Sequence, residues 1–234
     1  MKKLYIVGCG GFGREVLWLA ERINDAETAR GNDKIWEIAG FIDDNSSIHG
    51  TRQDGYLVLG GCEELKACKE EVYAVIAIGS AKIKRAVEEK LADCKQIHFA
   101  TLIDPSVIRS DRVQIGAASI LCAGTILTVG VTIGRHVILN LDCTLGHDAV
   151  LKDYVTVYPS ANLSGNVWVG EGAELGTGMQ VIQGKRIGAA SIVGAGAVVV
   201  KDLPPRCTAV GNPARVIKFL NESRYDEDIN ISQS

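Results

Sequence analysis

The sequence lacks the features of nucleic-acid-binding, membrane-spanning and exported proteins. Its 25 Lys and Arg residues against 28 Asp and Glu residues give a net charge of −3, which argues against a nucleic-acid partner. No stretch approaches the roughly 20 apolar residues that a membrane helix needs. The apolar run after the first three residues breaks at Gly8, so we expect no signal peptide.

The cysteines show neither a disulfide pattern nor a metal-binding pattern. Their number is odd, and no two have C-x-x-C spacing, so a zinc site would lack paired ligands. The seven positions are Cys9, Cys62, Cys68, Cys94, Cys122, Cys143 and Cys207. We expect no metal and reduced thiols in a cytoplasmic protein, with Cys122 and Cys143 as small core residues.

A strict six-residue period dominates the second half of the chain. Every sixth residue from Ile115 to Val199 is a branched aliphatic. A helix repeats its apolar face every 3.6 residues and a strand every 2, so neither alone explains this period. The period is typical of a parallel β-helix, in which short strands alternate with tight corners and one residue per strand points inward.

Other phases of the repeat support a β-helix. Small or modest side chains recur four residues after each aliphatic until Lys185 interrupts them, which indicates a corner that bulges outward near Gly184. Glycines recur directly after the aliphatic, for example Gly116 and Gly146. At these glycines we expect unusual dihedral angles and close backbone approach.

The first hundred residues show no six-residue period and alternate between strand and helix patterns. We expect strands at 4–8, 38–42, 73–78 and 96–102, and helices at 14–24, 63–69 and 83–92. This order predicts a small parallel α/β domain, which is about half of a full dinucleotide-binding fold. Because the sequence pattern changes at Pro105, we divide the chain into a Rossmann-like domain at 1–104, a β-helix domain at 105–218 and a polar C-terminal tail at 219–234.

The first turn matches a phosphate-binding motif. Residues 8–13 read Gly-Cys-Gly-Gly-Phe-Gly between an expected strand and an expected helix, which fits G-x-G-x-x-G. Such glycines let backbone N–H groups and the helix N-terminus approach a phosphate. Asp43 and Asp44 end the second strand, further along than in a typical NAD fold. The motif predicts a nucleotide, and a tight turn without a ligand stays open.

His147 is the candidate base among the four histidines. It lies two residues after an aliphatic position, where its side chain should project outward. An imidazole can accept a proton near neutral pH, and Asp148 could fix its tautomer. Adjacent strand residues point to opposite faces, so this contact requires a corner. We expect surface or structural roles for His49, His98 and His136.

Several motifs in the right order resemble one enzyme family. They are GCGGFGRE (8–15), GFIDD (40–44), AIGS (77–80), VILN (137–140), GHDAV (146–150), NLSGNV (162–167), VVVKDLPP (198–205) and VGNPAR (210–215). Together they resemble the left-handed β-helix sugar acyltransferases with an N-terminal Rossmann-like domain. That group includes bacterial nucleotide-aminosugar N-acetyltransferases and sialic acid O-acetyltransferases. The resemblance covers about residues 3–218. It implies that the domain at 1–104 binds a nucleotide sugar and that the domain at 105–218 is the acyltransferase domain.

The resemblance implies a role for each matched residue. His147 would be the general base of an acetyl transfer from acetyl-CoA, and Asp148 would assist it. The implied acetyl-CoA-binding residues are Gly165, Thr177, Ala195, Arg215 and Lys218. The implied substrate-binding residues are Gly10, Gly11, Phe12, Gly13, Asp43, Asp44, Gly79, Ser80 and Asn140. The resemblance also implies a homotrimer with an active site between neighbouring subunits.

These roles predict an acetyl-CoA-dependent acetyltransferase that acts on the amine of a nucleotide-linked 4-amino-4,6-dideoxy sugar. The alternative is an O-acetyltransferase acting on sialic acid or another surface-polysaccharide sugar. Phe12 and Thr156 stand where some N-acetyltransferase members carry histidines, so the identity of the substrate stays open. From the residues alone, a non-catalytic scaffold and an NAD-linked oxidoreductase also stay open, although the missing second half-domain disfavours the oxidoreductase.

Overall fold

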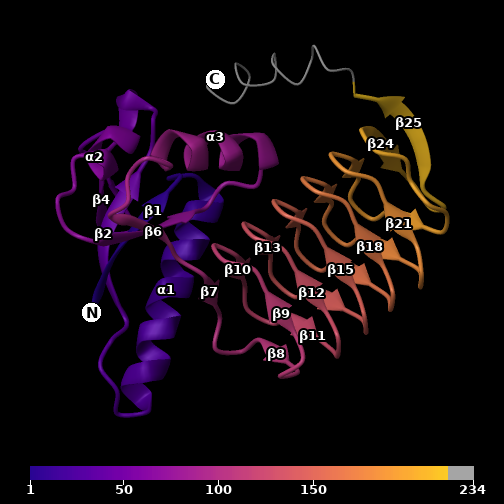
Figure 1. Cartoon of the computed structure of the whole chain (residues 1–234), viewed down its shortest axis with the longest axis horizontal. Helices are drawn as coiled ribbons and strands as arrows, with labels where there is room; N and C mark the ends of the chain where they lie inside the picture. Colours follow the sequence, from indigo (N-terminus) through magenta and orange to yellow (C-terminus); the bar gives the residue numbers. More distant parts are fainter. Residues whose placement is uncertain (221–234) are drawn as a thin grey trace.

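The computed structural model describes residues 1–220, which form an α/β domain followed by a three-sided parallel β-helix (Figure 1). This combination confirms the fold class expected from the sequence. Most of the predicted tail at 219–234 lies outside the described residues, which end at 220. Its first residue, Phe219, is the last residue of a strand. Within the described part, no helix is both long enough and apolar enough to cross a bilayer.

A six-stranded sheet with the order β3-β4-β2-β1-β5-β6 forms the centre of the α/β domain. All neighbouring strands are parallel except β3 and β4. Alternate residues of β1 belong to two hydrophobic clusters, so this strand is buried on both faces, as is typical of parallel sheets. The elements are β1 Lys2–Val7, α1 Gly11–Ala29, β2 Trp36–Ile42, the 3-10 helix η1 Ser46–Ile48, β3 Arg52–Gln53, β4 Tyr56–Gly60, α2 Cys62–Lys66, β5 Val72–Ile76, α3 Ala81–Leu91 and β6 Ile97–Phe99.

The helices and strands expected in this domain are all present, but the hairpin β3–β4 was not predicted. Asp54 and Gly55 form its turn, both with positive φ. Asp-Gly between two strands is a strong hairpin signal, and it was available in the sequence. The strand expected at 96–102 ends at Phe99, because Leu102 already begins β7, which pairs with β10 of the β-helix.

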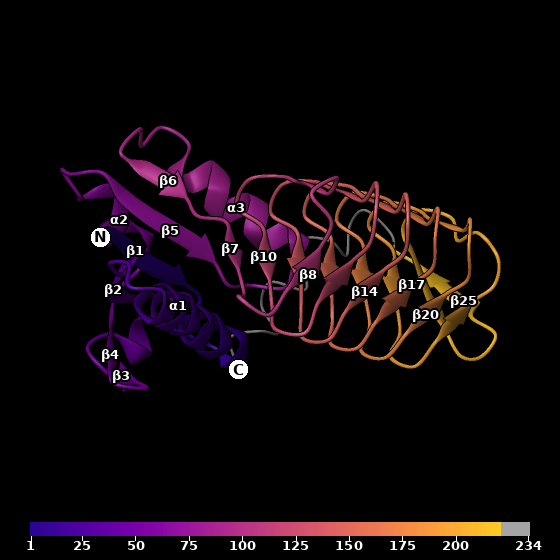
Figure 2. The ribbon, with the colours of Figure 1, turned by 90° about the horizontal axis from the view of Figure 1, so that it is seen from below.

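Successive coils of the β-helix are 18 residues long and stack on three faces (Figure 2). Face 1 contains β7, β10, β13, β16, β19, β22, β24 and β25; face 2 contains β8, β11, β14, β17, β20 and β23; face 3 contains β9, β12, β15, β18 and β21. The strands are β7 Leu102–Ile103, β8 Ile108–Arg109, β9 Gln114–Ile115, β10 Ile120–Leu121, β11 Ile126–Leu127, β12 Thr132–Ile133, β13 Ile138–Leu139, β14 Thr144–Leu145, β15 Val150–Leu151, β16 Thr156–Val157, β17 Asn162–Leu163, β18 Trp168–Val169, β19 Glu174–Leu175, β20 Gln180–Val181, β21 Arg186–Ile187, β22 Ile192–Val193, β23 Val198–Val199, β24 Cys207–Val210 and β25 Arg215–Phe219.

Two positions in each six-residue repeat fill the interior of the β-helix. The aliphatics of the series are at most 2% exposed from Leu121 to Val199. The residues four positions later, such as Cys143 and Ala149, are equally buried except for the half-buried Lys185, whereas the sequence suggested only one inward residue per strand. The expected bulge at Lys185 does not occur, because its carbonyl accepts the Trp168 N–H at 2.9 Å and continues the ladder.

Every sixth residue from Ala118 to Gly196 has a positive φ between 53° and 78° and turns the chain at a corner. Corner A, between faces 1 and 2, is formed by residues 124, 142, 160, 178 and 196; corner B, between faces 2 and 3, by 130, 148, 166 and 184; corner C, between faces 3 and 1, by 118, 136, 154, 172 and 190.

The glycines that directly follow the aliphatics serve coil-to-coil contact and not the turn. Gly146 is not among the residues with positive φ, so the unusual dihedral angles expected there were wrong. A Cβ on Gly146 would lie only 2.6 Å from the backbone nitrogen of Gly165 in the next coil. The expected close backbone approach is therefore present.

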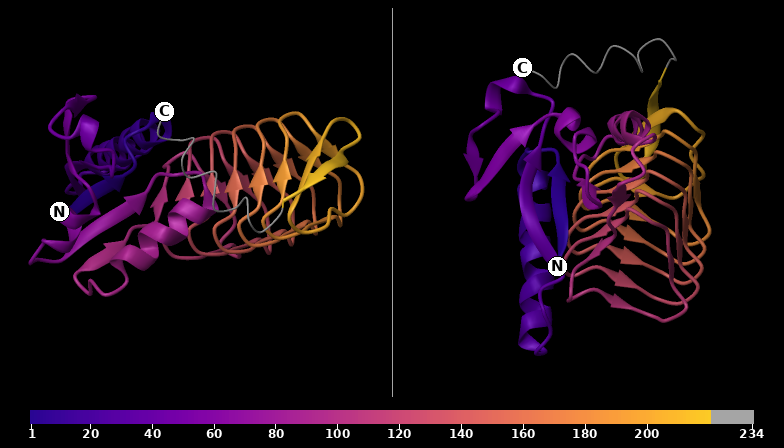
Figure 3. Two further views of the ribbon diagram at one scale, coloured as in Figure 1. Left: turned by 90° about the horizontal axis from the view of Figure 1, so that it is seen from above. Right: turned by 60° about the vertical axis from the view of Figure 1, so that its left-hand side comes forward.

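The α/β domain packs on face 1 and corner C of the β-helix (Figure 3). Leu17 and Ala20 of α1 share a hydrophobic cluster with Ile120 and Ile138 of face 1. Helix α3 contacts corner C, where Arg85 pairs with a carboxylate of the β-helix. Corner B, which lies between the other two faces, is therefore on the far side of the β-helix from the α/β domain.

Candidate active site

His147 and Asp148 lie side by side at corner B. Asp148 occupies the turning position, with φ +58°, and its N–H is held by the carbonyl of Val129 at 2.9 Å. This left-handed turn brings two adjacent side chains together, and His147 Nδ1 lies 2.9 Å from Asp148 Oδ2. The carboxylate accepts, so Nδ1 carries the hydrogen and Nε2 is left as a proton acceptor. The corner that the sequence required for this contact is therefore present.

Gly165 lies directly beside the imidazole, one coil further along corner B. The Asn166 N–H donates to the carbonyl of His147 at 2.7 Å, which holds the two coils in register. A Cβ on Gly165 would lie 2.6 Å from His147 Cε1 and closer still to Nε2. Only glycine fits here without displacing the ring.

The backbone N–H of Gly165 is a donor without an acceptor in residues 1–220. At the same phase of other corners the N–H points out of the ladder, since Arg135 N–H donates to Asp153 Oδ1 at 3.0 Å and Leu141 N–H to Asn140 Oδ1 at 2.7 Å. Corner B thus places an outward N–H next to a basic ring nitrogen. Such a pair can hold a developing oxyanion and receive a proton.

The other implied β-helix residues gather at corner A. Asn140 precedes this corner in one coil and is 8% exposed. Thr177 and Ala195 follow in higher coils, and the Gly196 N–H donates to the Thr177 carbonyl at 2.8 Å. Arg215 begins β25 and pairs with Val210 near the same corner.

Lys218 lies further along β25, paired with Thr208. Corners A and B are separated by face 2, which is about five residues or roughly 16 Å wide at 3.3 Å per residue. Within one chain the structure therefore does not bring Asn140, Thr177 or Ala195 to His147.

A cavity of about 370 Å³ lies at the carboxyl ends of β1 and β2. Parallel sheets place ligands at this edge. The lining residues are Val7, Gly8, Cys9, Gly10, Ile42, Asp43, Asp44, Asn45, Ile48, Cys62, Ile78, Ile83 and Val87. We call it the edge pocket. Of the expected substrate-binding residues, it includes Gly10, Asp43 and Asp44.

The other residues of the glycine-rich turn have different roles. A Cβ on Gly10 or Gly11 would meet no atom within 4 Å, so both leave space for a ligand. Gly13 is glycine for packing, because its Cβ would overlap the carbonyl of Gly8. Phe12 packs against the hydrophobic cluster of α1 and β1 and does not line the edge pocket.

The side-chain carboxylates of Asp43 and Asp44 both accept hydrogen bonds from other residues of the chain. Asp43 accepts the Cys9 N–H at 2.9 Å and the Asn45 N–H at 3.0 Å. Asp44 accepts the Cys62 N–H at 2.9 Å and pairs with Lys90 at 3.1 Å. Burial would raise the pKa of Asp44, but these two donors outweigh it and lower the pKa overall.

Gly79 and Ser80 lie between the edge pocket and the β-helix. Ser80 is the N-cap of α3, and its hydroxyl accepts the Ile83 N–H at 3.5 Å. The carbonyl of Gly79 accepts a hydrogen bond from Thr156 of face 1 at 2.6 Å. Neither residue lines the edge pocket, although their neighbours Ile78 and Ile83 do.

The chain is similar to one domain family and to several known proteins. Residues 3–91 match the PglD N-terminal domain family. The acetyltransferase domain of PglB from Neisseria gonorrhoeae, solved with acetyl coenzyme A, is 31% identical with a TM-score of 0.79, over 92% of this chain and 99% of that one. A mutant of perosamine N-acetyltransferase from Caulobacter crescentus, solved with CoA and GDP-perosamine, is 30% identical with a TM-score of 0.78, over 93% and 98% of the two chains. Galactoside O-acetyltransferase of Escherichia coli is 33% identical over 75 residues, which are 31% of this chain and 34% of that protein.

The chain belongs to the left-handed β-helix acetyltransferase family with a PglD-type N-terminal domain. This membership confirms the family that the sequence motifs indicated. The chain spans only about a fifth to a third of the length of the curated relatives it matches. No group of three or more His, Cys, Asp or Glu in residues 1–220 could hold a metal ion.

Sequence reasoning missed the apolar wall of the edge pocket. Ile48, Ile78, Ile83 and Val87 read as ordinary core residues, and only Ile78 carries a signal, because it follows the carboxyl end of β5. The cysteines lie as expected, with Cys122 and Cys143 buried and all seven thiols free.

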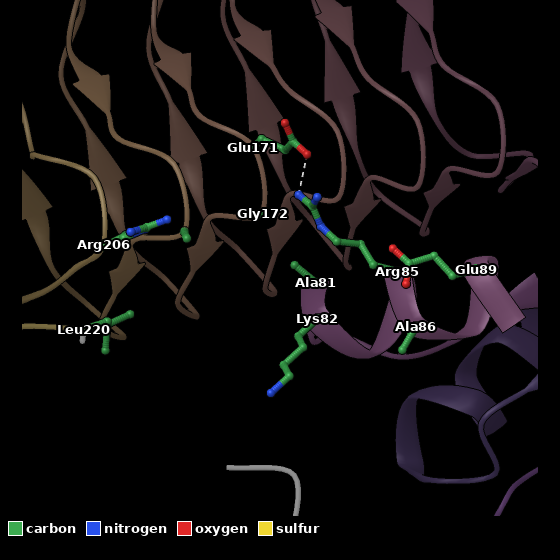
Figure 4. A pocket seen from close by; sticks show the side chains of 10 residues that line it. Ala81, Lys82, Arg85, Ala86, Glu89, Glu171, Gly172, Arg206 and Leu220 are labelled. Atoms are coloured by element: carbon green, nitrogen blue, oxygen red, sulfur yellow. Dashed lines mark hydrogen bonds and ion pairs between the residues drawn. The ribbon is translucent and has the colours of Figure 1, made fainter. Parts of the chain in front are cut away.

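A larger cavity of about 570 Å³ lies between α3 and corner C (Figure 4). Its lining includes Lys82, Arg85, Glu171 and Arg206, and Arg85 and Glu171 form an ion pair across it. It contains none of the residues expected to act in the family reaction and lies away from corner B. Charged groups of both signs line it, so its chemistry does not single out one ligand.

Proposed function

We propose that the chain transfers the acetyl group of acetyl-CoA to the amine of a nucleotide-linked 4-amino-4,6-dideoxy sugar. The observation that carries this proposal is the group at corner B, in which Asp148 orients His147 and the Gly165 backbone abuts the imidazole. Two relatives that match nearly the whole chain were solved with acetyl coenzyme A or with CoA and GDP-perosamine, which supports both the donor and a nucleotide-linked acceptor.

In the proposed reaction, the neutral amine attacks the thioester carbonyl carbon. The new N–C bond forms and the C–S bond breaks, and His147 Nε2 takes a proton from the nitrogen. The imidazolium then gives this proton to the departing CoA sulfur and returns to its neutral form. General-base catalysis of this kind contributes roughly 10²–10⁴-fold. The Gly165 N–H donates to the carbonyl oxygen as it gains negative charge, which contributes roughly 10²–10³-fold.

The reaction requires a second copy of the chain. Corner B holds His147, Asp148 and Gly165. The other implied acetyl-CoA and substrate residues of the β-helix lie at or near corner A, namely Asn140, Thr177, Ala195 and Arg215. The α/β domain packs on face 1 and corner C. A cyclic homotrimer resolves this separation, because corner A of one copy can face corner B of the next. Each groove would then hold the acetyl-CoA arm between two copies.

The edge pocket is the proposed nucleotide site. Gly10 and Gly11 leave open space next to the start of α1, where backbone N–H groups favour phosphate. The carboxylates of Asp43 and Asp44 already accept hydrogen bonds from backbone N–H groups and from Lys90. They are better suited to shape the pocket and to accept ribose or sugar hydroxyls.

The alternative, O-acetylation of sialic acid or another surface-polysaccharide sugar, is favoured by one observation. A stretch of 75 residues of the chain also matches galactoside O-acetyltransferase at 33% identity. The two proposals differ in the acceptor and not in the role of His147. A cytoplasmic location and a place in polysaccharide biosynthesis stay predictions.

A screen of acceptors tests the proposal. The full-length chain is incubated with acetyl-CoA and GDP-, UDP- or dTDP-linked 4-amino-4,6-dideoxy sugars, with sialic acid and its cytidine nucleotide in parallel, and products are read by mass spectrometry. We expect a 42 Da gain (one acetyl group for one hydrogen) on one amino-sugar nucleotide. The His147→Ala variant serves as the inactive control. Acetylation of sialic acid alone would decide for the alternative, and no transfer to any sugar would overturn both.

A further inference from the structure

Lys84 of α3 is buried between the two domains and bonded to the β-helix. Its side chain is 1% exposed. Its Nζ donates to the carbonyl of His136 at 2.9 Å and to Thr156 Oγ1 at 2.9 Å. His136 lies at corner C and Thr156 on face 1, so one side chain spans both parts of the β-helix that contact the α/β domain.

Thr156 forms a second hydrogen bond with the α/β domain. Its hydroxyl accepts from Lys84, and it donates its own hydrogen to the carbonyl of Gly79 at 2.6 Å. Gly79 is also enclosed on its other side, since a Cβ there would lie 2.9 Å from the hydroxyl of Tyr158. Lys84, Thr156 and Gly79 thus form a continuous chain of hydrogen bonds, which we call the α3 clamp.

The α3 clamp does not depend on a counter-ion. Both acceptors of Lys84 are neutral, and no carboxylate in residues 1–220 forms an ion pair with it. An amine with two N–H groups satisfies two acceptors. Burial lowers the pKa of Lys84 to about 7, against a smaller opposing effect of Glu174. The uncharged amine therefore prevails in this site above neutral pH.

Helix α3 connects the α3 clamp to the edge pocket. Ile83 and Val87 line the pocket from one side of the helix, while Lys84 faces the β-helix from another. Ile78, one residue before Gly79, also lines the pocket. A shift of the Gly79 loop or of α3 would therefore move one wall of the pocket relative to the β-helix.

We propose that Lys84 and Thr156 are positioning residues that fix the acceptor pocket relative to the β-helix corners, so that a bound nucleotide sugar reaches the acetyl site. The inference rests on the proposed function. It assigns the two residues no contact with the reacting atoms. Their loss changes the placement of the acceptor and leaves the binding of acetyl-CoA intact, because the acetyl-CoA residues lie at corners A and B.

A matched pair of variants at one position tests the α3 clamp. Thr156→Val removes the hydroxyl with little change in shape, and Thr156→Ser keeps it. In the full-length chain we expect Thr156→Val to raise the KM for the nucleotide sugar about tenfold with an unchanged KM for acetyl-CoA. Thr156→Ser should keep both values within about twofold of wild type. Lys84→Met should resemble Thr156→Val, and Lys95→Met, at an exposed position after α3, is the control.

A second measurement separates this inference from the proposed function. Hydrogen exchange of residues 77–84 needs no substrate, and we expect it to be at least tenfold faster in Thr156→Val than in Thr156→Ser. If the wild type acetylates no sugar but the exchange differs as expected, the proposed function fails and the α3 clamp stands as a domain contact only, which overturns the positioning role. If the wild type is active and Thr156→Val leaves the acceptor KM unchanged, or raises both KM values equally, the positioning role is wrong.

Discussion

Gly165→Ala is the sharpest test of corner B, because it adds one carbon and nothing else. The new Cβ would lie 2.6 Å from His147 Cε1 and 2.7 Å from Cδ2, against about 3.5–4.0 Å for carbon atoms at their optimal separation. The imidazole must therefore move by about 1 Å. A misplacement of this size costs on the order of 100-fold in rate, so we expect kcat to fall about 100-fold.

The same substitution should leave folding unchanged. Gly165 is not among the residues with positive φ, and alanine occupies the same phase of the repeat at Ala117, Ala189 and Ala195. We expect the free energy of unfolding to stay within about 0.5 kcal/mol of wild type. The matched control is Ala117→Ser, which adds one atom at the same phase of corner C.

Release of the CoA thiol gives kcat, calorimetry gives acetyl-CoA affinity, and urea unfolding gives stability. Near-wild-type kcat in a folded Gly165→Ala chain would refute the contact between the Gly165 backbone and the His147 ring as part of the active site.

Three further predictions concern His147, the shared groove and Lys84. His147→Ala should lose at least 100-fold in kcat, as expected for a general base, while acetyl-CoA affinity by calorimetry and the unfolding midpoint stay close to wild type; a variant within about threefold of wild-type kcat would remove His147 from the mechanism. Asn140→Ala and His147→Ala should each be impaired alone, but co-expression should restore about a quarter of the sites, because mixed trimers place an intact corner A beside an intact corner B. If the co-expressed protein is no more active than the two single variants, both residues belong to a site within one chain. Burial lowers the pKa of Lys84 from its ordinary 10.5 to about 7 in the folded chain. Between these pH values the unfolded chain binds a proton that the folded chain does not, so the free energy of unfolding should rise with pH from about 7 towards 10.5. If urea unfolding gives the same pH dependence of this free energy for wild type and Lys84→Met, the prediction is wrong.

The β-helix was predictable because its structure is local. Each repeat places one aliphatic, one small residue and one corner in fixed order, so a single period specifies strands, interior and stacking. Even the separation of the corners is available in the sequence. His147 and Gly165 differ by 18 residues and share a corner, whereas His147 and Thr177 differ by 30, which is not a multiple of 18.

The contacts between domains were not predictable from such local patterns. Lys84 lies in a helix rich in charged residues, and its burial depends on Thr156 and His136, which are 72 and 52 residues away. Asp44 reads as a solvated strand end or a ligand, and its bonds to Cys62 and Lys90 come from two separate helices. A period or a motif carries no information on partners of this kind.

The turn at Asp148 has a consequence for how this chain can change. Six of the turning positions, such as 130 and 184, are glycine, which adopts positive φ without strain. For most other residues this conformation costs about 1–2 kcal/mol, and aspartate tolerates it better than most. Replacing Asp148 by glycine would therefore relax the backbone but remove the carboxylate that holds His147. Selection for thermal stability alone would favour glycine at position 148. Selection that also requires catalysis would retain the aspartate.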